Sequence, residues 1–319
     1  GVGRARRRRN KPERTPTVTD SPQAAQVSAF VKTCFLRACA LDVAVRKPGN
    51  VSAASPGHGM AAAQFLASAR AAVEPLFVPG ERVGPRIERA MAATLAAAGC
   101  NTNLGILLLC APIAAAIEQP AALRGTAQLR AALQATLCGL DLDDTRHAYR
   151  AIALANPAGL GRAQAEDVHD EPHLPQRAAM ALAAPRDSIA RQYANGFDDV
   201  FDVASRFPRP GFSLIEVDPD APVDHATAAS VQQVFLSFFS RWPDSHIVRK
   251  HGGAVAHTVM SAAQAWQGHP GPDADPAFAA WDEALKAQRI NPGTSADLSV
   301  AALLLAGLLG RPGQVWHGK

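Results

Sequence analysis

Five polar clusters interrupt the apolar stretches of this chain, and their residue types suit the binding of an anion. The clusters are KPGNVSAASPGHGM at 47–60, the segment 88–105, RDSIARQYANGF at 186–197, DSHIVRKHGG at 244–253 and NPGTSAD at 291–297. Glycine beside Ser, Thr or Asn leaves backbone N–H groups free at the start of a helix, where they can hold a phosphate or another anion. The same pattern caps helices that bind no ligand. Each cluster alone therefore leaves capping and anion binding open.

Helical patterns surround these clusters. Apolar residues recur at helical spacing from Val27 to Leu41, after Ser21-Pro22, a pair that suits a helix start. Further helices are expected at 61–73, 85–98, 102–118, 121–138, 143–155, 174–184, 186–206, 226–241, 246–267, 276–289 and 295–310. A short strand is possible at 212–217, but one strand makes no sheet. The sequence therefore predicts an all-α fold, a single-domain bundle of about eleven helices within residues 21–319.

Composition supports a helical protein that does not cross a membrane. Of its 319 residues, 48% are hydrophobic and only 6% are aromatic, which favours helices packed through small side chains over a β-sandwich. The longest apolar runs, 104–117 and 298–309, are too short to span a bilayer. The five cysteines form no CxxC pair, and no basic-then-apolar signal sequence is present. We therefore expect buried, reduced cysteines and a cytoplasmic location.

The positive charge of the chain is concentrated in its first residues. The formal net charge is +4, but residues 1–14 carry seven Lys and Arg against one Glu, a net of +6, so the remainder sums to −2. Residues 1–20 are predicted to be a disordered basic arm. The remaining sequence has no basic stripe and no aromatic platform for stacking bases. Nucleic-acid binding is thus expected only through the arm, at residues 4–14.

Segment 156–175 is the least regular part of the chain outside the arm. It is long for a connection without secondary structure, which indicates a functional loop or a mobile lid. It contains His169 and His173 among four acidic residues, at positions 166, 167, 170 and 171. This group could bind a metal, but its proline-flanked, acid-rich setting favours a solvated loop.

Taken together and in order, the five clusters resemble the triphosphoribosyl-dephospho-CoA synthase family. The resemblance covers about residues 25–310, and the segments GCNTNLG at 99–105 and NPGTSADL at 291–298 are its most specific parts. It implies an all-helical enzyme that takes ATP, releases adenine and joins the ribose 5-triphosphate to a hydroxyl of dephospho-CoA. Such a reaction requires Mg²⁺ beside the triphosphate, a carboxylate beside the sugar cation, and a base for the acceptor hydroxyl.

The resemblance also suggests roles for residues within the clusters. The candidate carboxylates for the metal or the sugar are Glu88, Asp187 and Asp244, and Asp297 is either a helix-start charge or a ligand. The candidate phosphate-binding residues are Lys47, Asn101, Thr102, Gly105, Arg249, Lys250, Thr294 and Ser295. The best general base is His58, because the flanking Gly57 and Gly59 let its ring approach a ligand closely.

Two motifs depart from the family pattern. The family motif GxNTHKG has Asn103 and Leu104 in place of its histidine and lysine, and DxGxHxDM loses both aspartates at 55–60. Losing one charged contact to a phosphate costs about 1.5–3 kcal/mol, which indicates a changed donor or acceptor. The sequences of segments 156–168 and 186–197 resemble those of a divergent branch of the family, which is associated with tetrahydromethanopterin biosynthesis.

Three functional hypotheses follow. The first is a transferase that moves a ribosyl (poly)phosphate from a nucleotide to an acceptor hydroxyl in that cofactor pathway. The second is the family's own reaction with ATP and dephospho-CoA. The third is a non-catalytic nucleotide or nucleic-acid binding protein that uses the basic arm. The first two share small-molecule substrates and Mg²⁺, and the sequence leaves the oligomeric state open.

Overall fold

The computed structural model describes residues 22–157, 160–206 and 223–310. Its α-helices are α1 (Pro22–Ala44), α2 (Ala62–Leu76), α3 (Val83–Ala98), α4 (Leu104–Ala116), α5 (Thr126–Cys138), α6 (Leu142–Ala155), α7 (Gln176–Ala183), α8 (Ser188–Asn195), α9 (Asp198–Ser205), α10 (His225–Phe239), α11 (Ser245–His251), α12 (Gly253–Gln264), α13 (Pro276–Ala287) and α14 (Gly293–Leu309). Two short 3-10 helices, η2 (Ala122–Arg124) and η3 (Pro272–Ala274), complete the elements. The described residues contain no strand, which confirms the all-α prediction. The basic arm and segment 212–217 lie outside the described residues.

The described residues contain fourteen α-helices, more than the eleven or so predicted, in part because two expected helices are each divided at a glycine. The expected helix 186–206 is divided into α8 and α9 at Gly196, whose φ is +75°, and Phe197 follows with φ +65°. The expected helix 246–267 is divided into α11 and α12 at Gly252, with φ +88°. A left-handed residue ends a helix because the next N–H group no longer points along the helix axis.

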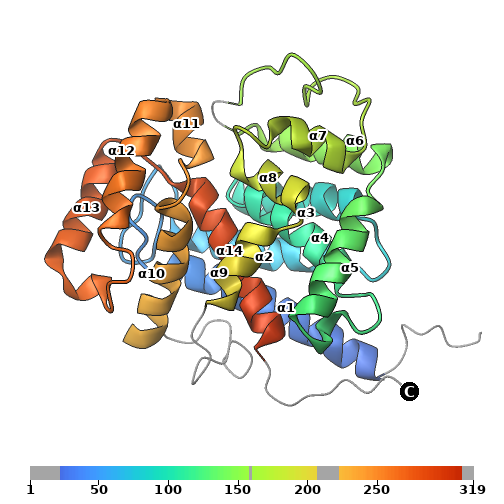
Figure 1. Ribbon diagram of the computed structural model, residues 1–319, viewed down its shortest axis with the longest axis horizontal. Helices are drawn as coiled ribbons and strands as arrows, with labels where there is room; N and C mark the ends of the chain where they lie inside the picture. The colour runs from blue at the N-terminus through green and yellow to red at the C-terminus, as the bar shows by residue number, and fades with distance from the viewer. Residues whose placement is uncertain (1–21, 158–159, 207–222, 311–319) are drawn as a thin grey trace, which may run out of the picture.

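Helices α4 and α14 form the centre of the fold. Figure 1 shows α14 passing through the middle of the molecule, with α1, α9, α10 and α4 around it. Both helices are apolar on all sides, from Leu104 to Ala116 and from Leu298 to Leu308, and most of their side chains are buried. A helix without a polar face must be enclosed by others. The remaining helices are therefore packed as a shell around this pair.

A second, smaller cluster of apolar side chains lies among α10, α11, α12 and α13, on the left of Figure 1. Trp281 stacks on both Phe239 and Trp266, with ring centroids 5.9 and 6.4 Å apart. Ile290 and Ala296 join this cluster from the segment at the start of α14. The N-terminal end of the central helix is thus fixed between two cores.

The sequence predicted buried, reduced cysteines and no helix long enough to span a membrane. Cys34, Cys39 and Cys110 are buried and all five cysteines are free, but Cys138 is exposed and accepts a hydrogen bond from Arg177. Cys100 is half-buried, so the prediction that all cysteines are buried was wrong for Cys100 and for Cys138, which lies at the end of α5. No helix in the described part of the chain has the length and apolar character needed to cross a membrane.

The loop at 45–61 is anchored on α13 and on the segment that precedes α14. Asp282 accepts a hydrogen bond from the backbone N–H of Gly49 at 2.8 Å, and Asn50 donates to Asn291 at 2.9 Å. Gly49 has φ +82°, and a Cβ atom there would lie 2.8 Å from the carbonyl oxygen of Ile290. The backbone of Gly49 therefore packs directly against the backbone of Ile290, and only glycine allows this close approach.

We predict that Gly49→Ala lowers the free energy of unfolding by about 2–4 kcal/mol, because it adds a backbone clash to the left-handed strain. Gly59→Ala is the matched control, since Gly59 has φ +72° but a Cβ atom there would meet nothing within 4 Å. The control should lose only about 1–2 kcal/mol. Urea unfolding of both variants measures the difference, and equal losses would contradict the close packing at Gly49.

Candidate functional site

A cavity of about 1190 Å³ receives residues from all five polar clusters. Its walls are the N-terminal ends of α4, α8, α11 and α14, the loop at 50–60, and segment 160–168 with parts of α6 and α7. Figure 1 shows α8, α11 and the start of α14 near one another below the loop that follows α6. The predicted site residues that line the cavity are His58, Asn101, Thr102, Gly105, Asp187, Arg249, Lys250 and Thr294. Lys47, Asp244 and Ser295 are buried outside its lining, and Glu88 lies elsewhere.

Two of the helix starts have backbone N–H groups available for an anion. At α4, Asn101 accepts the N–H of Leu104 at 3.1 Å, while no described residue accepts those of Gly105 and Ile106. At α14, the N–H groups of Gly293 and Thr294 likewise have no acceptor within the described ranges. The first N–H groups of a helix lack intrahelical partners and carry its positive dipole end. These two helix starts can therefore bind phosphate oxygens.

The other two helix starts are capped by their own aspartates. The Oδ1 atom of Asp187 accepts the N–H groups of Ile189 and Ala190 at 2.9 and 3.0 Å. Its Oδ2 atom forms an ion pair with Arg249 at 2.9 Å. The capping alternative therefore applies at Asp187, although this residue also lines the cavity.

Asp244 is buried and connects α11 to α14. Its Oδ1 atom accepts the N–H groups of His246 and Ile247, and its Oδ2 atom accepts the N–H and the hydroxyl of Ser295 at 2.7 and 2.8 Å. Burial raises the pKa of Asp244, and the hydrogen bonds from Ser295 oppose that rise. A carboxylate with four donors is a structural group, so the structure separates Asp244 and Ser295 from the cavity surface.

Asp297 has the carboxylate that is best placed to act on a ligand. It lines the cavity, and no hydrogen bond joins it to any described residue. A Cβ atom on Gly105 would lie 2.0 Å from its Oδ2 atom, so glycine at 105 provides the space that this carboxylate occupies. Burial raises the pKa of Asp297 well above its usual range, and the negative charges of Asp42 and Asp244 add to the rise.

Lys47 and Asp42 form a buried pair behind the loop. The Nζ atom of Lys47 lies 3.2 Å from Oδ1 of Asp42, and the lysine side chain has no exposed surface. Lys47 thus neutralises a buried carboxylate and does not reach the cavity. Asp42 lines the cavity and was missed in the sequence, where it is one acidic residue in an apolar helix.

Two histidines face the cavity. His58 has φ +57° between two glycines, and its Nε2 atom lies 2.7 Å from the carbonyl oxygen of Gly49. Burial lowers the pKa of His58. His246, which was not predicted, has a pKa lowered to about 4, first by burial and then by the charges of Arg249 and Lys250. Both rings are therefore neutral at physiological pH.

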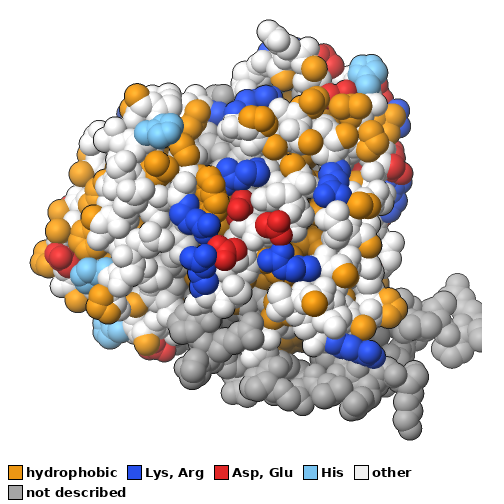
Figure 2. Space-filling view, in the orientation of Figure 1, with side chains coloured by type: hydrophobic (Ala, Val, Ile, Leu, Met, Phe, Trp, Pro, Cys, Tyr) orange, Lys and Arg blue, Asp and Glu red, His pale blue; other side chains and the backbone are white. Residues whose placement is uncertain are grey.

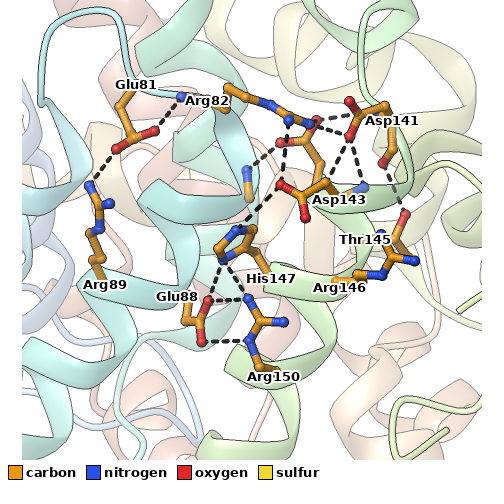
Figure 3. A network of polar contacts seen from close by, with 12 residues as sticks. Glu81, Arg82, Glu88, Arg89, Asp141, Asp143, Thr145, Arg146, His147 and Arg150 are labelled. Carbon is orange, nitrogen blue, oxygen red and sulfur yellow. Dashed lines mark hydrogen bonds and ion pairs between the residues drawn. The ribbon is translucent and has the colours of Figure 1, made fainter. Parts of the chain in front are cut away.

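Glu88 lies on the outer side of α3 and faces α6 (Figure 3). Arg150 donates to its two oxygens at 2.8 and 3.0 Å, and His147 contacts the same carboxylate. The hydrogen bond from Arg150 is the main cause that lowers the pKa of Glu88. Because Ile87, Ala90 and Met91 occupy the buried face of α3, Glu88 points away from the cavity. The structure therefore does not group Glu88 with Asp187 and Asp244.

The acidic residues of segment 160–175 stabilise that segment. Asp167 accepts the N–H groups of Ala163 and His169 at 2.6 and 2.9 Å, and these bonds lower its pKa to about 2. Glu166 accepts a hydrogen bond from Tyr149 at 3.2 Å. No group of three or more His, Cys, Asp or Glu in the described ranges is arranged to hold a metal ion.

The cavity nevertheless fits a Mg²⁺ ion that is delivered with a polyphosphate. Such an ion needs only one or two carboxylates, because phosphate oxygens and water complete its coordination. Asp297 offers a carboxylate without a hydrogen-bond partner in the described residues, and Asp42 lies close enough to raise its pKa. The predicted ligands Asp187 and Asp244 use their oxygens for helix caps and for Arg249 or Ser295.

The fold is all-helical, and residues of all five polar clusters line one cavity. A family model described as "CitG: ATP:dephospho-CoA triphosphoribosyl transferase" matches residues 28–314. The chain belongs to this family, which confirms the resemblance found in the sequence, and the protein is a transferase.

Structural comparison supports the fold. The chain is similar to a protein from Archaeoglobus fulgidus described as a candidate triphosphoribosyl-dephospho-CoA synthase, with a TM-score of 0.56 and 20% sequence identity. The match covers 77% of this chain and 98% of the other. A search of curated proteins finds no match.

We predict that Asp297→Asn raises the free energy of unfolding at pH 7, because it removes a carboxylate that burial and neighbouring aspartates destabilise. Folding raises the pKa of Asp297 above its ordinary value of 3.8, so the destabilisation is present at neutral pH and disappears below about pH 3.8. Asp244→Ala is the contrasting variant and should lose roughly 2–4 kcal/mol with its cap and bonds. Urea unfolding at pH 7 measures both, and a destabilised Asp297→Asn protein would refute the role given to this carboxylate.

Proposed function

We propose that the protein transfers the triphosphoribosyl group of ATP to a hydroxyl of dephospho-CoA and releases adenine. The observation that carries the proposal is the position of Asp297, whose carboxylate lines the same cavity as two helix starts with available N–H groups. Phosphate recognition and stabilisation of a sugar cation need these two kinds of group side by side. The family match over residues 28–314 supports this reaction more strongly than the tetrahydromethanopterin hypothesis.

The triphosphate is assigned to the cationic end of the cavity. Lys250 is exposed there and forms no ion pair with any described residue, while Arg249 reaches Asp187 from the same helix. Gly293 and Thr294 supply N–H groups at the start of α14. A Mg²⁺ ion held by Asp297, with help from Asp42, would neutralise part of the phosphate charge. The residues from three separate clusters would thus share one ligand group.

The displacement at the anomeric carbon breaks the bond to adenine and forms a bond to the acceptor oxygen. Positive charge develops on the ribose, and a carboxylate such as Asp297 stabilises it. A β-nucleotide that becomes an α-riboside is inverted, so one in-line displacement suffices. The acceptor hydroxyl loses one proton and the departing adenine takes one up, which balances the reaction.

His58 is assigned as the base for the acceptor hydroxyl. When its Nε2–H donates to the Gly49 carbonyl oxygen at 2.7 Å, Nδ1 is the unprotonated nitrogen. Burial lowers the pKa of His58, so the ring can accept a proton at neutral pH. His246 adds a second neutral ring in the same lining.

A pterin-type acceptor is the second candidate, favoured by one observation at α4. Leu104 is buried, and with Asn103 it stands where the family motif places a lysine and a histidine. The helix start therefore binds phosphate through N–H groups without a lysine charge. Binding of nucleic acid by the folded part finds less support, because Lys and Arg are interspersed with Asp and Glu near the middle of the face in Figure 2. The pairs Arg191–Asp199 and Arg241–Asp202 are examples of such neighbouring opposite charges.

The direct test incubates the protein with Mg-ATP and dephospho-CoA and measures free adenine by chromatography. We expect stoichiometric adenine and triphosphoribosyl product, and the same rate after removal of residues 1–20. Adenine release with a pterin-type acceptor alone would assign the second candidate. No release with either acceptor, together with no stabilisation by ATP in a thermal-shift assay, would refute the transferase proposal. Loss of ATP binding on removal of the arm would favour the third hypothesis.

We predict that His58→Gln lowers kcat by ~10²–10⁴-fold with little change in the KM for ATP. Glutamine can keep a hydrogen bond to the Gly49 carbonyl, so the loop should stay in place. Because the pKa of His58 is lowered from 6.5, the acidic limb of the wild-type rate profile should lie below pH 6.5 and disappear in the variant. A variant that keeps this limb would show that another group is the base.

A further inference from the structure

Three exposed leucines distinguish one wall of the cavity. Within the described residues, the large hydrophobic side chains that are exposed are Leu154, Leu160 and Leu182, at 51%, 37% and 47%. All three line the cavity, although they come from α6, the following segment and α7. Exposed apolar side chains that gather in one place mark a binding site. Hydrophobic side chains are visible at the surface over α7 in the upper part of Figure 2.

The wall around these leucines is apolar and is separate from the phosphate end. Ile152, Ala155, Ala179 and Met180 continue it between α6 and α7. Two cations of the lining, Arg162 and Arg186, lie in this part of the chain, and both are engaged within the protein. Arg162 pairs with Asp170 at 3.4 Å, and Arg186 donates to the backbone carbonyl oxygen of Leu182 at 3.3 Å. The cations that are left for a phosphate, Arg249 and Lys250, belong to α11, and the available helix starts belong to α4 and α14. One cavity thus has a charged end and an apolar end.

A second apolar surface contributes to the lining from other helices. Met60, Phe65 and Leu95 come from the loop before α2, from α2 and from α3, and all three side chains are half-buried. A cavity with an apolar lining and a few placed polar groups is typical of small-molecule sites. A triphosphate does not suit this apolar surface, because its oxygens need hydrogen-bond donors or cations. An uncharged, partly apolar group of a ligand fits the surface better.

We propose that Leu154, Leu160 and Leu182 bind the uncharged arm of the acceptor and make the acceptor specific. The inference rests on the proposed function, which places the donor triphosphate at the other end of the same cavity. The arm is the aliphatic, amide-linked part of a dephospho-CoA-type acceptor or the fused heterocycle of a pterin-type acceptor. Both groups are neutral and largely apolar, and both extend away from the reacting hydroxyl.

The test compares Leu154→Gln and Leu182→Gln with Leu154→Met and Leu182→Met. Glutamine places a polar group on the wall, whereas methionine keeps the volume and the apolar character. We expect each glutamine variant to lower kcat/KM for dephospho-CoA about tenfold, with no change in the KM for ATP. The methionine variants should stay near the wild type, and circular dichroism melts check that all four proteins fold.

A truncated acceptor provides the chemical control. Adenosine diphosphate carries the nucleoside diphosphate of dephospho-CoA without the aliphatic arm, so the leucine wall should not affect its turnover. The wild type should prefer dephospho-CoA, and the glutamine variants should lose that preference. The same series with a pterin-type acceptor decides which arm the wall accepts.

Calorimetry separates failure of this inference from failure of the proposed function. Titration with dephospho-CoA, or with the pterin-type acceptor, measures acceptor binding without catalysis. Weaker acceptor binding by the glutamine variants supports the subsite even if no adenine is released. Equal acceptor affinity in wild type and variants would overturn the inference, as would a loss confined to ATP binding. A change in oligomeric state at unchanged acceptor affinity would assign the leucines to contact with a second copy of this chain.

Discussion

The buried carboxylate of Asp244 fixes the geometry on which the cavity depends. It caps α11 with one oxygen and holds the N–H and hydroxyl of Ser295 with the other, so two helices begin at one point. Removing one partner from such a buried network leaves uncompensated polar groups. Ser245 then accepts the N–H of Ser188 at 2.9 Å, and Arg249 reaches Asp187. Three helix starts from distant parts of the chain are thereby connected through side chains.

This connection divides the four helix starts into two kinds. The starts of α8 and α11 are neutralised by Asp187 and Asp244, which makes them structural supports. At the starts of α4 and α14 the N-cap residue gives no side-chain cap, and the N–H groups of Gly105, Ile106, Gly293 and Thr294 have no acceptor among the described residues. A helix start attracts an anion only while its donors are unused. The positions of the capping aspartates therefore decide which helix starts keep N–H groups without an acceptor among the described residues.

The sequence predicted the helical fold and the convergence of the clusters better than the role of each residue. Asp187 and Asp244 were found because acidic residues beside helix starts are visible in the sequence, but their use as caps depends on geometry. Glu88 lies near a motif in sequence, yet the apolar face of α3 turns it toward α6. Asp42 and His246 acquire their positions only through packing, since a lone charge in an apolar helix has no local signal. Assigning a role to each of these residues requires knowing which face of its helix is turned toward the cavity.

In the proposed function, Asp297 belongs to a binding site that reduces the stability of the protein that contains it. Its carboxylate lies against Gly105, where any side chain would overlap it. Burial raises the pKa of Asp297, and the neighbouring aspartates add to the rise. A structural carboxylate would acquire donors, as Asp244 has done with Ser295 and the start of α11. The absence of donors from the described residues leaves Asp297 to be satisfied by a cation or a developing positive charge. The unfavourable electrostatics of the free protein would then be relieved when Mg²⁺ and the donor nucleotide bind, which couples ligand binding to the stability of the cavity.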